Sequence, residues 1–170
     1  AVGLLGPQDP RTNAAVVFVW AGWWAGYTAT VYFLGNSWPA LNPWRRIADA
    51  LPVEPSRSLP TRFGPWPAVI GLLALIWIEV VAPVGSDPQL LATVVVGYTL
   101  LTVAGAVVFG SGAWFDRVDP IARVFRCYGR IAPIQRAWSG LELRLPGAAA
   151  TDRADDASVE PVFVITVLWA

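Results

Sequence analysis

Gln89-Leu-Leu-Ala-Thr-Val-Val-Val-Gly-Tyr-Thr-Leu-Leu-Thr-Val-Ala-Gly-Ala-Val-Val-Phe-Gly110 is the stretch that decides the fold. It is strongly apolar and contains no charged residue. As an α-helix rising 1.5 Å per residue it would be roughly 33 Å long, enough to cross the hydrocarbon core of a bilayer. A helix also satisfies its own backbone hydrogen bonds, as the bilayer interior requires. The stretch therefore predicts a transmembrane helix.

Three further apolar runs extend this interpretation. They cover residues 14–35, 66–83 and 162–170, and the last begins a fourth span. The runs lack the alternation and regular turn signals of a membrane β-barrel. The predicted fold is an all-α polytopic transmembrane helix bundle with short amphipathic interfacial helices. All 170 residues are assigned to one membrane domain.

The composition agrees with a membrane protein. Apolar residues make up 55% of the chain and charged residues 14%, whereas soluble domains average about 25% charged residues. Basic and acidic residues balance at 12 each, which excludes a typical nucleic-acid binder. Because the chain lacks an initiator Met and its last apolar run is short, we expect a piece of a longer protein. The expected partners are the lipid bilayer and the remaining helices of that protein.

The sequence contains no catalytic constellation. There is no His and one cysteine, Cys127, so we expect no zinc or copper site of the usual type. Without His there is no Ser-His-Asp triad, and no glycine-rich phosphate loop is present. We therefore predict no cofactor and assign no catalytic, cofactor-binding or metal-binding residue.

The arginines indicate an orientation. The turn near Gly85 has no basic residue, and the N-terminal stretch has only Arg11. The connections after the first and the third predicted spans are both rich in arginine. These alternate connections lie on the same side of a membrane. By the positive-inside rule they are cytoplasmic, with the N-terminus outside, in a cell membrane. The arginines are Arg45, Arg46, Arg57 and Arg62 in one connection, and Arg117, Arg123, Arg126, Arg130, Arg136, Arg144 and Arg153 in the other.

Both arginine-rich connections open with an Asx-Pro pair, Asn42-Pro43 and Asp119-Pro120, which is typical of a helix start. We expect amphipathic helices over 43–51 and 120–132 that lie in the membrane surface. The alternative is that they pack against the cytoplasmic end of the bundle. In the first case, five arginines are predicted to contact lipid phosphates or other anions. They are Arg45, Arg46, Arg123, Arg126 and Arg130.

Three other features stand out. Glu79 is the one ionisable residue inside a predicted span, so it is a candidate relay, or an interfacial residue near the outer end.

Gly22 and Gly26 form a small-residue face that favours helix packing. Residues 145–160 are rich in alanine and acidic residues, and we expect a flexible cytoplasmic loop there.

The chain contains signs of an internal repeat. Short matches also arise by chance in a biased composition, so the repeat is a hypothesis. If real, it is a parallel repeat of spanning helix, surface helix and spanning helix, as transporters often contain. The matched residues are Gly26-Tyr27-Thr28 with Gly97-Tyr98-Thr99, Gly35 with Gly110, Trp38 with Trp114, and Asn42-Pro43 with Asp119-Pro120.

The stretch Gly35-Asn-Ser-Trp-Pro-Ala-Leu-Asn-Pro-Trp-Arg45 resembles a group of long multi-pass membrane proteins from haloarchaea and actinobacteria. Phe18-Val-Trp20, Trp23-Trp24 and Trp66-Pro-Ala-Val69 are similar to that group as well. Some members carry the label fenitrothion hydrolase. The resemblance reaches to about Pro133 and implies a polytopic membrane protein, but it transfers no catalytic residue.

The leading functional hypothesis is a permease-like or transport-associated protein, motivated by the repeat, the arginine-rich helices and Glu79. A second hypothesis is a membrane enzyme acting on lipid or a hydrophobic substrate, with reactive groups outside these residues. A third is a structural subunit of a membrane complex, which the small-residue face of Gly22 and Gly26 would serve.

Overall fold

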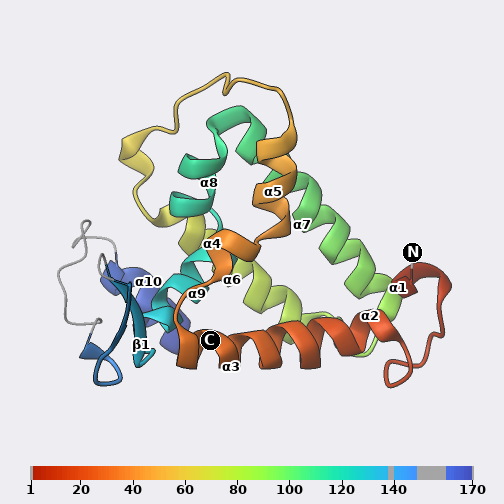
Figure 1. Cartoon of the computed structure of the whole chain (residues 1–170). Coiled ribbons are helices and arrows are strands. Elements are labelled where there is room, and N and C mark those ends of the chain that lie inside the picture. Colours follow the sequence, from red (N-terminus) through yellow and green to blue (C-terminus); the bar gives the residue numbers. More distant parts are fainter. Residues whose placement is uncertain (1, 138–139, 149–159, 170) are drawn as a thin grey trace.

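The computed structural model of the chain describes residues 2–137, 140–148 and 160–169, and it is mostly helical (Figure 1). The predicted all-α class is therefore confirmed for these residues, with one short hairpin of β1 (Ile134–Ala137) and β2 (Gly140–Leu143). The helices are α1 (Val2–Leu5), α2 (Ala14–Val17), η1 (Phe18–Tyr27), α3 (Thr28–Leu34), α4 (Trp38–Leu41), α5 (Pro43–Ala50), η2 (Thr61–Phe63), α6 (Trp66–Val81), α7 (Pro88–Phe109), α8 (Ser111–Arg117), α9 (Pro120–Gly129) and α10 (Glu160–Trp169).

The first long helix covers Ala14–Leu34 and consists of α2, η1 and α3 without a break. It begins at the buried Asn13, whose side chain accepts hydrogen bonds from two backbone N–H groups of the first turn. Between Phe18 and Tyr27 it is wound as a π-helix, which pairs each residue with the fifth one along. It ends at Gly35, whose φ of 79° favours glycine.

The next two helices lie close to their predicted positions. α6 stops at Val81, two residues short of the predicted 66–83, and α7 begins one residue before the predicted 89–110. Asp87 caps α7 by accepting hydrogen bonds from Gln89 and Leu90 N–H, and Pro88 occupies the first turn. α10 covers the region where a fourth span was predicted. Most of the predicted acidic loop, 149–159, lies outside the described residues.

Both Asx-Pro pairs start helices as expected. Asn42 caps α5 and Asp119 caps α9, each through its side-chain oxygen. However, most of α9 is buried, and its arginine face is only partly open: Arg123 is 7% exposed, and the Arg126 side chain is 35% exposed. Its guanidinium lies 5.0 Å from the centre of the Phe163 ring, a cation–π contact that offsets part of the cost of burial. The packing agrees with the alternative in which this helix caps the bundle.

The chain after α9 differs from the prediction. The helix ends at Gly129 instead of reaching residue 132, and an antiparallel hairpin follows in which Ile134 pairs with Leu143. The sequence analysis anticipated neither this hairpin nor the short helices α4 and α8. α8 starts directly after Gly110, whose φ of 89° lets the chain turn sharply out of α7.

The described helices form two units with the same order of elements. In each unit a long helix ends at a positive-φ glycine, then a short helix, an Asx-Pro helix and a further apolar helix follow. The units exchange their Asx-Pro helices: α5 packs against α7 and α8, while α9 packs against α3 and α4. α6 and α10, the equivalent last helices, pack against each other. The packing is therefore reciprocal for α5 and α9.

The exchanged helices fill the space between the two long ones. In Figure 1 the Ala14–Leu34 helix and α7 start together at the N-terminal side, where α1 contacts both α2 and α7, and then diverge. α4, α5, α8 and α9 lie between their separated ends. The largest buried cluster lies in this wedge and includes Val31, Trp38, Phe115 and Phe125.

Candidate functional site

Two tyrosines form matching aromatic contacts where the units meet. The ring of Tyr27 lies edge-on to Phe125 of α9, with centroids 5.0 Å apart and planes at 90°. The ring of Tyr98 lies edge-on to Trp44 of α5, also at 5.0 Å and at 83°. Such edge-to-face pairs are favourable beyond the area they bury. Each Gly-Tyr-Thr tyrosine therefore holds the Asx-Pro helix of the other unit.

The hydroxyl groups of the two tyrosines have different partners. Tyr27 shares a 2.8 Å hydrogen bond with Ser37, whereas Tyr98 donates a 2.5 Å hydrogen bond to Asp119 Oδ2. The other oxygen of Asp119 accepts from Ala122 N–H at 2.7 Å. The two units thus differ at this point, because only in the second does the described tyrosine contact a buried carboxylate, that of the helix cap Asp119. The equivalent cap, Asn42, is neutral.

A groove between α6 and α7 leads to Asp119. Its volume is about 340 Å³, and its wall is mainly apolar. Among the described residues, the polar side chains in it are Tyr98, Thr102, Trp114 and Asp119, and Asp119 carries the one carboxyl group among them. The lining residues are Pro67, Gly71, Ala74, Leu75, Ile78, Val94, Gly97, Tyr98, Leu101, Thr102, Trp114, Val118, Asp119 and Pro120.

The environment of Asp119 disfavours its charge. Burial raises the pKa of this carboxyl above its ordinary value, and this effect outweighs the lowering by hydrogen bonds from Tyr98, Ala122 and Ile121 and by the charge of Arg45. The residue is 1% exposed. A carboxylate whose donors do not fully replace its hydration is stabilised further by a cation.

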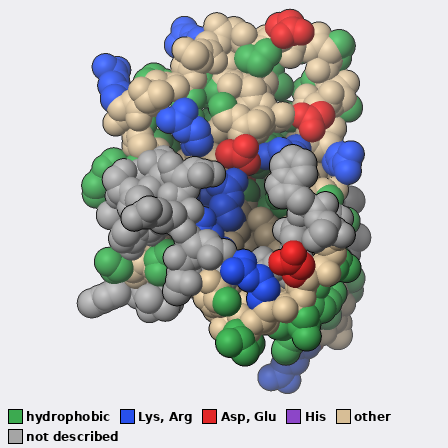
Figure 2. All heavy atoms as spheres, turned by 60° about the vertical axis from the view of Figure 1, so that its left-hand side comes forward, with side chains coloured by type: hydrophobic (Ala, Val, Ile, Leu, Met, Phe, Trp, Pro, Cys, Tyr) green, Lys and Arg blue, Asp and Glu red, His purple; other side chains and the backbone are tan. Residues whose placement is uncertain are grey.

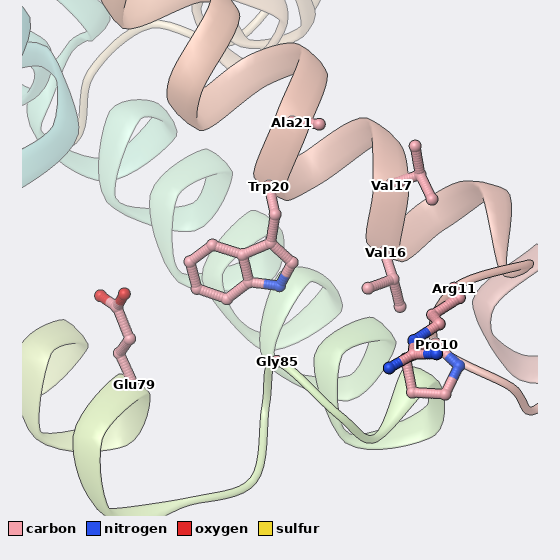
Figure 3. A pocket seen from close by; sticks show the side chains of 8 residues that line it. All are labelled: Pro10, Arg11, Val16, Val17, Trp20, Ala21, Glu79 and Gly85. Carbon is pink, nitrogen blue, oxygen red and sulfur yellow. The ribbon is translucent and has the colours of Figure 1, made fainter.

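Glu79 lies in a separate, more open cleft of about 540 Å³. Figure 3 shows Glu79 on one side of the Trp20 indole and Arg11 on the other, with Val16 beside them. Gly85 also lines this cleft, so the N-terminal stretch and the turn after α6 meet at one end of the molecule. Glu79 is exposed, and both interpretations of this residue, relay and interfacial, stay predictions.

The predicted anion-binding arginines contact the protein itself. Arg45 and Arg126 both bind Asp116 Oδ1, at 3.1 and 2.9 Å, and Arg46 donates to the Ala40 carbonyl. Arg123 is buried against Phe163 as described above, and Arg130 follows the last residue of α9. Figure 2 shows arginine and acidic side chains gathered around a hollow on the face that carries these elements.

The small-residue face of the first helix has no close helix partner among the described residues. A Cβ on Gly22 would meet only Phe18, and one on Gly26 only Ala21, both of the same helix. Close approach occurs instead at Gly105, where a Cβ would overlap the Trp114 ring. The predicted packing role of Gly22 and Gly26 has no contact within the described chain.

Sequence analysis missed Asp119 and Tyr98 as site residues, although both lie in the repeated motifs. The signal was the difference between the two Asx-Pro pairs, one neutral and one acidic. Within residues 2–137, 140–148 and 160–169, no group of three or more His, Cys, Asp or Glu is placed to hold a metal ion. No family model, curated protein or solved structure matches the chain.

Proposed function

We propose that the chain belongs to a multi-pass membrane protein with a permease-like function, whose substrate enters the groove between α6 and α7. Two helices, Ala14–Leu34 and Pro88–Phe109, are long and apolar enough to cross a membrane. In the most apolar 18-residue stretch of each helix, only 11% and 22% is buried. The core helix of a soluble protein is mostly buried. This exposed apolar surface is the observation that carries the membrane proposal, because lipid would cover it.

The shorter α6 supports the same arrangement. Its exposed face is apolar, and the spacing of four and three residues places these side chains in one stripe along the helix. A stripe of this size is unfavourable in water and favourable against acyl chains. The exposed residues of the stripe are Trp66, Ile70, Leu73, Trp77 and Val80.

Contacts between distant segments support the proposed orientation. Arg45, after the first long helix, and Arg126, after α7, both bind Asp116, so the two arginine-bearing segments adjoin. At the other end Arg11 and Gly85 line one cleft. This pairing of segments fits cytoplasmic arginine-rich connections with the N-terminus and the Gly85 turn outside.

The permease-like proposal rests on the groove. A buried carboxylate–phenol pair lies at one end of an apolar groove between two helices, and the two units are related by reciprocal packing. Transporters built from repeats bind their substrates where the repeats meet. The groove therefore supplies an apolar binding surface with one charged group for recognition.

Flux into proteoliposomes containing the full-length protein tests this function. We expect uptake of at least one member of a panel of amines, neutral amphiphiles and organic anions, above that of protein-free vesicles. Gly97 lines the groove, and a Cβ there would have no atom within 4 Å. A valine side chain would therefore occupy open space in the groove, so Gly97→Val should reduce this uptake. Glu79→Gln should leave uptake unchanged if Glu79 is interfacial. Uptake no faster than in protein-free vesicles for every solute would contradict the proposal.

A further inference from the structure

We propose that the groove between α6 and α7 binds a protonated amine with an apolar body, with the ammonium group at Asp119 and the body along the wall. The inference rests on the proposed function, since it names the chemical class of the permease substrate.

The charge of the groove selects a cation. Among the described residues that line the groove, Asp119 is the only one with an acidic or basic side chain, and this residue is almost completely buried. Arg45 acts on it through space but does not line the groove. An anionic ligand would meet this carboxylate in a medium of low dielectric constant and be repelled. A neutral lipid chain would pack along the walls of the groove. It would offer the carboxylate no charge or hydrogen bond to replace its lost hydration.

Asp119 retains capacity to accept another hydrogen bond. A carboxylate offers about four acceptor positions, and this one receives bonds from the Tyr98 hydroxyl and from the N–H groups of Ala122 and Ile121. One position is left for an ammonium N–H, and charge-assisted bonds of this kind are strong. The indole of Trp114, another residue of the wall, has a buried N–H with no acceptor among the described residues.

The shape of the groove requires an apolar body. The walls come mainly from aliphatic side chains and from glycines, among them Gly71 and Gly97. At Gly97 a Cβ would have no atom within 4 Å, so this part of the groove is open space. A volume of about 340 Å³ lies at the lower end of the range for small-molecule pockets, which suits a small arylalkyl amine better than a whole lipid.

Three probes that share a phenyl ring and a four-carbon chain test the selection. 4-Phenylbutylamine, 4-phenylbutan-1-ol and 4-phenylbutyrate are titrated into the full-length protein in nanodiscs, and heats are corrected with protein-free nanodiscs. We expect the amine to bind about tenfold or more tightly than the alcohol, and the anion least tightly. Equal binding of all three, tighter binding of the anion, or no binding by the amine would overturn the proposal.

Substitutions locate the site. Asp119→Asn keeps an N-cap side chain, since Asn42 serves in the equivalent position, and should remove the preference for the amine over the alcohol. Asp87→Asn makes the same change at another helix cap, outside the groove, and should leave the preference intact. Gly97→Val should weaken binding of amine and alcohol alike. A preference that survives Asp119→Asn would place the amine elsewhere and refute the assignment.

Binding and flux separate the two proposals. Amine binding that depends on Asp119 without flux of any solute would contradict the permease-like function and leave this inference standing. Flux of other solutes without amine binding would contradict this inference and leave the permease-like function standing.

Discussion

The hydroxyl of Tyr98 donates a 2.5 Å hydrogen bond to the carboxylate of Asp119, 21 residues further along the chain. The bond joins the middle of α7 to the first turn of α9, the helix that packs against the other unit. It therefore fixes the position of an exchanged helix and, at the same time, the orientation of the charged group in the groove.

Tyr98→Phe should destabilise the protein more than Tyr27→Phe. The first change leaves a buried carboxylate without one of its donors, which costs about 1–3 kcal/mol in unfolding free energy. The second breaks a bond between two neutral hydroxyls, Tyr27 and Ser37, and should cost about 1 kcal/mol or less. Thermal denaturation in detergent compares the variants. Equal losses would mean that the charge of Asp119 does not contribute to this bond.

The stability of the wild-type protein should fall relative to Asp119→Asn as pH rises from acid to neutral. The pKa of Asp119 is raised in the folded state by burial, so the folded protein binds this proton more tightly than the unfolded chain. The stabilisation is complete below the unfolded pKa of about 3.9 and is lost as pH rises through the folded pKa. Midpoints measured between about pH 3.5 and 7.5 should diverge. Parallel curves would contradict the raised pKa.

The sequence predicts the helices well because their determinants are local. Asn42, Asp87 and Asp119 are caps that can be recognised in the sequence, and each begins a helix. Length and scarcity of charged residues likewise identify the helices over 66–81, where Glu79 is the one ionisable residue, and over 88–109.

The remaining features depend on contacts between distant residues. The Tyr98–Asp119 bond, the exchange of α5 and α9 and the groove arise only when the two units are packed together. An amphipathic pattern alone also cannot distinguish a helix on a lipid surface from one buried in a bundle. For this reason the burial of Arg123 against Phe163 was outside the reach of sequence analysis.

Gly105→Ala should destabilise the protein by about 1–3 kcal/mol. A Cβ at this position overlaps the Trp114 ring, which lies directly against the α7 backbone. Gly97→Ala on the same helix is the matched control, because nothing lies within 4 Å of its Cβ and alanine favours helices over glycine by up to about 1 kcal/mol. Denaturation midpoints should thus move in opposite directions. A Gly105→Ala variant as stable as the wild type would show that Trp114 relaxes without cost.

Asp116→Asn should have a small effect that depends on salt. Arg45 and Arg126 share one oxygen of Asp116, and the carboxylate is half exposed. Exposed pairs contribute about 0.2–1 kcal/mol each, and salt screens them. We expect a modest loss of stability at low salt that nearly disappears at about 1 M salt. A large loss independent of salt would mean that the carboxylate supports the structure in another way.

Labelling from outside the cell should distinguish the two ends of the bundle. Single cysteines replace exposed residues of the full-length protein in a background in which Cys127, and every cysteine outside these 170 residues, is replaced by serine. Glu54→Cys and Leu145→Cys follow the arginine-bearing helices, and Gln8→Cys and Ser86→Cys lie at the other end. Because charge bias places the arginine-rich connections in the cytoplasm, a membrane-impermeant maleimide should modify only the last two in intact cells.

Permeabilised cells provide the control for this experiment, since all four positions should then react. The pairing is the informative part. Arg45 and Arg126 both bind Asp116, so the segments that carry Glu54 and Leu145 share one side whatever the absolute orientation. If the reactive pair were Glu54→Cys and Leu145→Cys, the positive-inside assignment would be reversed but the bundle would stand. If Glu54→Cys and Leu145→Cys reacted from opposite sides, the helices between them could not span the bilayer as proposed.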